Sequence, residues 1–138
     1  TIQYITIAST GNATDFGDLT VVKQFCGGLS SSTRGVISGG NSSPSTPTNV
    51  MDYITIASTG NATDFGDMTT IFDDSGIMGV SNSLRGVWLG MCAPANGTRS
   101  NIMEYITIST TGDTLDFGDL TVASNFGAGT SDGHGGLS

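Results

Sequence analysis

The chain carries the segment Ile5-Thr6-Ile7-Ala8-Ser9-Thr10-Gly11-Asn12-Ala13-Thr14-Asp15-Phe16-Gly17-Asp18, which returns unaltered at residues 54–67. A third version, with small changes, occupies residues 106–119. A segment that returns in this way is typical of tandem structural repeats, in which each unit buries its apolar face against the next one.

The spacing of the copies predicts the domain organisation. Each copy opens with a tyrosine, at Tyr4, Tyr53 and Tyr105. Successive opening tyrosines are 49 and 52 residues apart. We therefore expect a single repeat domain over residues 1–138, with unit 1 at 1–49, unit 2 at 50–101 and an incomplete unit 3 at 102–138.

One unit contains the pattern of several short strands. Residues 4–8 are rich in β-branched side chains and place apolar groups on both faces, which indicates a strand covered on both sides. Gly11 and Asn12 tolerate the positive φ of a turn. Further strands are expected at residues 16–20, as an outer strand, and at 25–29 and 35–38. About four strands per unit predict an all-β fold of four-stranded repeats, like the blades of a β-propeller.

Charge and composition restrict the classes of partner. Four basic residues stand against twelve acidic ones, and the net charge of −8 disfavours nucleic acid and anionic lipid. No segment approaches the roughly 20 apolar residues of a membrane-spanning helix, so we expect no membrane insertion. The surface rich in hydroxyls and amides favours an extracellular or virion protein. The start at Thr1, without a signal-peptide pattern, indicates a mature chain or a fragment of something longer.

The order of these features resembles a kelch-type propeller blade. The resemblance rests on a first strand that ends in a glycine pair, a second that carries tyrosine and a third that carries an aromatic residue. These are Val36-Ile37-Ser38-Gly39-Gly40, Met51-Asp52-Tyr53-Ile54-Thr55-Ile56 and Asp64-Phe65-Gly66-Asp67-Met68. Phenylalanine replaces the tryptophan of the family in every copy, and Trp88-Leu89-Gly90-Met91 replaces the glycine pair in unit 2. The resemblance implies about three blades, in an incomplete ring or one closed by oligomerisation.

The sequence of the repeat also resembles that of structural or tail-fibre-like proteins of marine bacteriophages. The matching segment covers residues 4–20 and is followed by Arg34-Gly35-Val36 and a glycine pair. This resemblance implies a non-enzymatic structural or adhesive module of a virion appendage that contacts the host surface. Its partners would be other copies of itself, other virion proteins, and a host-surface glycan or protein.

The segments that differ between units are the expected place for ligand recognition. Residues 41–49 and 93–101 vary in sequence while the strands hardly change, and variable loops on a constant scaffold usually carry specificity. The candidate ligand-binding residues in these segments are Ser43, Ser45, Thr46, Asn96, Thr98 and Arg99.

Two repeated sets of charged residues have a functional and a structural interpretation. The aspartates are Asp15, Asp18, Asp64, Asp67, Asp116 and Asp119. They suggest calcium, but each Asp-Phe-Gly-Asp turn offers only two carboxylates, so we expect solvated, turn-capping side chains. Arg34 and Arg85 occupy matching positions; they would either bind a ligand anion or, as we expect, bond backbone carbonyls or a nearby Asp between blades.

The sequence offers no recognisable catalytic site, metal site or cofactor motif. His134 is the only histidine and has no clear carboxylate, cysteine or histidine partner nearby in the sequence. We expect Cys26 and Cys92 to be buried free thiols, with one disulfide between them as the alternative. Two other functions stay open: a glycan-active propeller enzyme, which needs clustered carboxylates with raised pKa values, and a subunit of a self-assembling extracellular filament.

Overall fold

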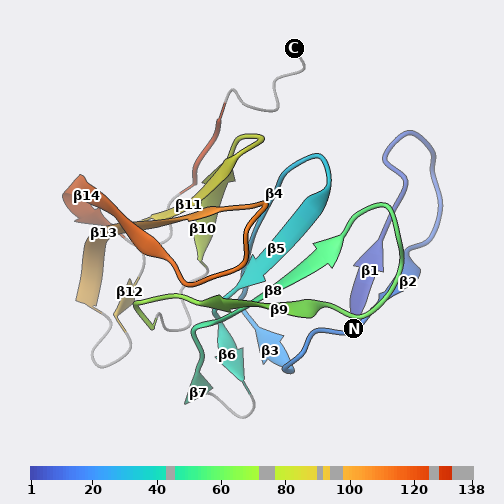
Figure 1. The fold of residues 1–138 in the computed structure, drawn as a ribbon, viewed down its shortest axis with the longest axis horizontal. Coiled ribbons are helices and arrows are strands. Elements are labelled where there is room, and N and C mark those ends of the chain that lie inside the picture. Colours follow the sequence, from blue (N-terminus) through green and yellow to red (C-terminus); the bar gives the residue numbers. More distant parts are fainter. Residues whose placement is uncertain (43–45, 72–76, 90–91, 94–97, 125–127, 132–138) are drawn as a thin grey trace.

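The computed structural model describes residues 1–42, 46–71, 77–89, 92–93, 98–124 and 128–131, and only the backbone of residues 92, 93 and 98. These residues form fourteen β-strands in four antiparallel sheets and no helix (Figure 1). The prediction of an all-β fold is therefore confirmed. Within the described part of the chain, no helix has the length and apolar character needed to cross a membrane.

Two of the sheets are antiparallel meanders built on one plan. The first has the strand order β4-β5-β8-β9, and the second has β10-β11-β13 with β14 on the far side of β13. The first sheet contains β4 (Gly27–Ser30), β5 (Arg34–Ser38), β8 (Val50–Thr55) and β9 (Thr63–Asp67). The second contains β10 (Met78–Ser81), β11 (Arg85–Leu89), β13 (Thr98–Thr107), β14 (Leu115–Ser124) and the short β12 (Cys92–Ala93), which pairs with the start of β13.

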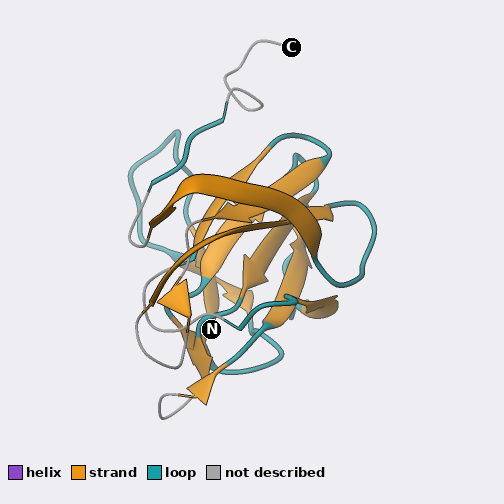
Figure 2. Ribbon diagram, turned by 90° about the vertical axis from the view of Figure 1, so that its left-hand side faces the viewer, coloured by secondary structure: helices purple, strands orange, loops and turns teal. Residues whose placement is uncertain are grey.

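Two smaller sheets complete the fold. One is the hairpin of β1 (Ile2–Tyr4) and β2 (Thr14–Gly17). The other joins β3 (Lys23–Gln24), β6 (Asn41–Ser42) and β7 (Thr46–Pro47). Figure 2 views the molecule from the side of β13 and β14, whose long curved strands cross in front of the other sheet.

The register of the strands repeats as well as their order. Val36 lies opposite Tyr53 in the first meander, and Val87 lies opposite Tyr105 in the second. The three hairpins that open with tyrosine strands, β1–β2, β8–β9 and β13–β14, each contain a register irregularity just before the tyrosine. Each complete meander takes its first two strands from one sequence unit and its last two from the next, so the sheets are offset from the sequence repeat.

The apolar core lies where the two meanders face each other. Its buried side chains come from both sheets and from residues next to their strands: Leu29, Val36, Met51, Phe65, Met68, Ile77, Trp88, Ile106 and Ile108. Complete burial of side chains as large as Trp88 and Phe65 stabilises the fold by roughly 1.5–3 kcal/mol each. Gly86 allows this packing, because a Cβ there would lie 2.3 Å from Leu29 Cδ2.

The first strands of successive sheets lie side by side. The Ser81 hydroxyl in β10 donates to the Ser30 carbonyl in β4 at 2.8 Å. The same contact recurs one step further along the chain, where the Ser131 hydroxyl donates to the Ser81 carbonyl at 2.6 Å. Residues 128–131 therefore pack beside β10 in the same way as β10 packs beside β4.

Successive copies are also joined through a contact that we call the turn–strand junction. The turn at residues 60–62 packs against the end of β2: Gly60 N–H donates to the Phe16 carbonyl at 2.7 Å, and Ala62 N–H to the Asp18 carbonyl at 2.8 Å. In return, Asp18 N–H donates to the Asn61 side-chain oxygen at 3.0 Å. A turn of one copy thus completes the outer strand of the copy before it.

The junction recurs between the second and third copies with the same atoms. Gly112 N–H donates to the Phe65 carbonyl at 2.7 Å, and Thr114 N–H to the Asp67 carbonyl at 3.0 Å. The amide of Asp67 donates to the Asp113 carboxylate at 2.9 Å. Because the same three hydrogen bonds occur twice, the junction is a property of the repeat.

Several sequence-based strand boundaries were wrong. The strand expected at residues 4–8 is β1, which ends at Tyr4. In the later copies, the matching strands β8 and β13 pair with β5 and β11. Among the described residues β1 has no such inner partner, and it is shorter. Residues 25–29 do not form one strand, because Phe25 adopts a φ of 60° between β3 and β4. The expected loop at 41–49 contains the paired strands β6 and β7, and part of the loop at 93–101 belongs to β13. No closed sheet occurs among the described residues, so closure into a propeller ring stays a prediction.

Candidate functional site

A small pocket recurs at the turn of each copy and is the candidate site. The turn follows the tyrosine strand and closes with the same backbone bond each time: Ser9 N–H to Thr6 O at 3.2 Å, Ser58 N–H to Thr55 O at 3.1 Å, and Thr110 N–H to Thr107 O at 3.1 Å. The turns enclose cavities of about 120 Å³ in the first copy, 130 Å³ in the second and 240 Å³ in the third.

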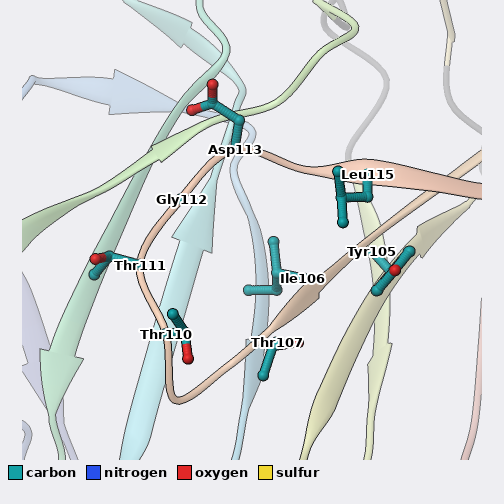
Figure 3. A pocket seen from close by; sticks show the side chains of 8 residues that line it. All are labelled: Tyr105, Ile106, Thr107, Thr110, Thr111, Gly112, Asp113 and Leu115. Carbon is teal, nitrogen blue, oxygen red and sulfur yellow. The ribbon is translucent and has the colours of Figure 1, made fainter.

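The third pocket shows the arrangement best (Figure 3). It lies between strand residues Tyr105–Thr107, the turn residues Thr110–Gly112 and Leu115 on the returning strand. Asp113 also borders the space, but its carboxylate points away from Ile106 and Thr107 and accepts the Asp67 amide of the neighbouring copy.

The tyrosines of the second and third pockets each contact a phenylalanine ring and an arginine. Tyr53 meets the ring of Phe65 edge to face, with centroids 6.0 Å apart, and the Arg34 guanidinium lies 4.4 Å from the Tyr53 centroid. Tyr105 has the same environment from Phe117, at 5.9 Å, and Arg85, at 4.9 Å. Cation–π and edge-to-face contacts of this kind stabilise the ring orientation.

The chemistry of these pockets suits weak recognition of a neutral, hydroxylated ligand. Their walls present a tyrosine, threonine or serine hydroxyls and a turn glycine. Such groups donate and accept hydrogen bonds, and an aromatic ring offers an apolar face. The one carboxylate among the described lining residues of the third pocket, Asp113, is already bonded to a backbone amide.

The predicted ligand-binding residues do not form one described cluster. Ser43, Ser45 and Asn96 lie outside the described residues, as does His134. Thr46 is exposed in β7, where its carbonyl accepts the Ser42 hydroxyl at 3.1 Å. Thr98 and the exposed Arg99 open strand β13 opposite Ala93 and Cys92, in a different sheet from Thr46. These two were expected in a loop, and backbone pairing with β12 places them in a strand instead.

The six repeated aspartates lie exposed on or beside the outer strands β2, β9 and β14. Asp64 and Asp116 each accept the amide two residues ahead, from Gly66 at 3.3 Å and Gly118 at 3.0 Å. Within the ranges that the structure describes, no group of three or more His, Cys, Asp or Glu side chains is placed to hold a metal ion. The turn-capping interpretation fits the contacts of Asp64 and Asp116.

Arg34 makes the structural contacts expected of it. Its guanidinium donates to the Ile108 carbonyl of the third copy at 3.1 Å and lies over Tyr53. Arg85 lies over Tyr105 but remains largely exposed. Both side chains therefore hold the tyrosine of their own sheet, and Arg34 also ties two copies together.

Two buried carboxylates were missed by the sequence analysis. Asp52 is fully buried; its Oδ2 lies 3.0 Å from Lys23 Nζ, as an ion pair without hydrogen-bond alignment, and the Thr20 hydroxyl donates to its Oδ1. Glu104, at the matching position, accepts from the hydroxyls of Thr69, Thr70 and Thr114 at 2.5, 2.5 and 2.6 Å. A polar residue just before each repeated tyrosine, within a mostly apolar strand, was the signal available in the sequence.

Cys26 has a free thiol and is half buried, where full burial was expected. Burial raises the pKa of the Cys26 thiol above its ordinary value; nearby Lys23 opposes this shift and Asp52 adds to it. The side chain of Cys92 lies outside the described part of the structure.

Comparison with known proteins adds no family assignment. No protein-family model matches the chain, and no curated protein matches its sequence.

Proposed function

We propose that this chain is a non-enzymatic scaffold of kelch-like blades from a phage virion appendage that contacts the host surface. The observation that carries the proposal is the turn–strand junction, which joins successive copies through the same three hydrogen bonds. A contact that each copy can pass to the next builds an extended array, which is what a fibre-like virion part requires.

The segments that vary between copies supply the proposed adhesive surface. The connection from β5 to β8 and the connection from β11 to β13 leave equivalent ends of the two meanders. The exposed Thr46 lies within the β5–β8 connection, and the exposed Arg99 lies at the start of β13, next to the β11–β13 connection. Variation confined to one end of a constant scaffold is the usual arrangement of a binding surface.

The positions of the charged groups favour a role without catalysis. Asp52 is paired with Lys23, Glu104 accepts three hydroxyls, and the repeated aspartates lie on outer strands. A glycan-cleaving enzyme needs two carboxyl groups facing each other across a cleft, with roughly 5–10 Å between them. The described carboxylates are instead engaged in contacts that hold the fold or lie exposed on strand edges.

The test is binding of the purified chain to envelope fractions from a panel of marine bacteria, measured by surface plasmon resonance. We expect binding to at least one fraction, and loss of at least about tenfold in affinity for the double variant Thr46→Ala, Arg99→Ala. Asp15→Ala, which changes an exposed side chain of β2 outside the three turn pockets, is the control. A chain that binds none of the fractions would contradict the adhesive role. Release of reducing sugar from any fraction would contradict the proposal that the chain is not an enzyme.

A further inference from the structure

The two ends of this chain present the two halves of one turn–strand junction. Residues 10–13 have the same sequence as 59–62, yet within the described structure the Gly11 amide, the Asn12 side chain and the Ala13 amide have no partner. At the other end, β14 offers the Phe117 carbonyl and the backbone of Asp119, which match Phe65 and Asp67. Among the described residues, one end therefore presents donors, and the other presents acceptors, without the partners that the two internal junctions supply.

Apolar side chains are exposed at the same two ends. Ile7 is 95% exposed, whereas Ile108 at the matching position of the third copy is 1% exposed. Phe117 is 47% exposed, whereas Phe65 at the matching position of the second copy is 2% exposed. Ile56, the counterpart in the second copy, is 45% exposed, and Phe16 is 8% exposed. Both positions are therefore more exposed at the ends of the described structure than in the copies that have a neighbour on the same face.

The backbone at β14 is shaped for a close approach. A Cβ at Gly17 would lie 2.2 Å from Gly60 O, and a Cβ at Gly66 would lie 2.5 Å from Gly112 O. Gly118 has the same positive φ, 124°, but a Cβ there would have Met103 Cε, at 4.0 Å, as its nearest neighbour. The space that a turn glycine fills at both internal junctions is therefore open at Gly118.

The strands at the two ends also complement each other. Residues 128–131 lie on β10 as the first strand of a further sheet would. The hairpin β1–β2 matches the last two strands of each meander, but no described strand lies on its inner side. Together, the two ends contribute parts of one four-stranded sheet.

The two ends also carry residues that match a polar side-chain contact found at both internal junctions. Thr20 and Thr69 donate to the buried carboxylates Asp52 and Glu104 of the following copy. Thr121 and Gln3 occupy the corresponding positions, and both are exposed. Gln3 supplies a side-chain oxygen that can accept the Thr121 hydroxyl.

We propose that a second copy of this chain docks head to tail, with its turn at residues 10–13 seated on β14 of the first. One chain cannot join its own ends, because β1–β2 and β14 lie at opposite sides of the molecule (Figure 1). The docking deepens the proposed scaffold role and rests on its repeat arrangement. A head-to-tail contact leaves one free face on each new copy, so assembly continues until a ring closes or a filament forms.

The test is sedimentation velocity of the full chain over a wide range of concentration, with thermal melting as the check of folding. We expect the mass to rise above the 14.0 kDa of one chain as concentration increases. Ile7→Glu on the turn face and Gly118→Ala on the strand face should each weaken association by at least about tenfold. The control is Leu84→Glu, which changes a side chain that is 67% exposed in the β10–β11 turn, away from both faces.

A mixture of the two face variants sharpens the test. Ile7→Glu keeps its strand face and Gly118→Ala keeps its turn face, so an equimolar mixture should form a pair and nothing larger. A wild-type chain that stays at the mass of one copy would overturn the proposal, as would association that Ile7→Glu and Gly118→Ala leave unchanged. A chain that stays monomeric yet binds envelope fractions would refute the docking alone and leave the adhesive role standing.

Discussion

Gly66 shows how one missing side chain permits the junction between copies. A Cβ there would lie 2.5 Å from the Gly112 carbonyl, and the φ of 136° disfavours any other residue. We expect Gly66→Ala to lower the free energy of unfolding by about 3 kcal/mol, from overpacking and backbone strain together. Gly118→Ala, with a similar φ and open space, should cost about 1 kcal/mol in the single chain. Equal losses in urea denaturation would contradict the close approach.

Glu104 accepts hydrogen bonds from the segment that joins the second copy to the third. Its carboxylate is 1% exposed and receives three hydroxyls. We expect Glu104→Ala to lower the free energy of unfolding by about 3 kcal/mol, because those hydroxyls lose a buried acceptor. The exposed Asp15→Ala serves as the control, with an expected change under about 0.5 kcal/mol. Similar losses in the two variants would show that the buried network does not stabilise the fold.

Cys26 gives the molecule a pH-dependent residue. Burial raises the pKa of its thiol in the folded chain, so folding favours the neutral form. The stability linked to this group is present below the pKa of the unfolded thiol and is lost as the pH rises through the higher folded value. In a Cys92→Ser chain, we expect alkylation of Cys26 by iodoacetamide to accelerate at a higher pH than in the same chain in denaturant. Coincident pH profiles would contradict this.

The turns at residues 10–13 and 59–62 have the same sequence, but only the second packs on the strand of a preceding copy in the described structure. The Asn61 side chain accepts the Asp18 amide at 3.0 Å, while Asn12, in the same fourteen-residue sequence, has no such partner. We expect Asn61→Ala to cost about 1 kcal/mol of stability and Asn12→Ala to be nearly neutral in the single chain. Thermal melting at low concentration measures both. Equal effects would mean that the asparagine acts within its own turn and not across the junction.

Sequence patterns predicted part of these elements and missed others for physical reasons. Alternating apolar residues and turn glycines indicated the strands β5, β8 and β9, which are long enough to show a pattern. The two-residue strands β6 and β7 are too short to show any periodicity. The positive φ at Phe25 could not be expected either, because bulky residues rarely adopt it.

The candidate site was less predictable than the fold. Variation between copies drew attention to Ser43, Ser45, Thr46, Asn96, Thr98 and Arg99, whereas the pocket that recurs in all three copies lies at the repeated turn. The junction was hidden for a related reason. Its turn and its outer strand belong to one repeated segment, and the sequence alone does not show that a turn packs on the strand of another copy.

The whole molecule is held together by contacts between neighbouring copies, as in other repeat proteins. Each internal junction combines backbone bonds, a close glycine contact and a buried carboxylate that accepts hydroxyls. Stability should therefore depend on the number of junctions as well as on the strands within each copy. A head-to-tail assembly adds junctions without any new kind of contact.

Residue-resolved amide hydrogen exchange on the monomeric Ile7→Glu chain tests the turn–strand junction most directly. The amides of Gly60 and Gly112 donate to the preceding copy, whereas Gly11, in the same sequence context as Gly60, has no described acceptor. The account predicts slow exchange at Gly60 and Gly112 and fast exchange at Gly11. Equal exchange at Gly11 and Gly60 would contradict it.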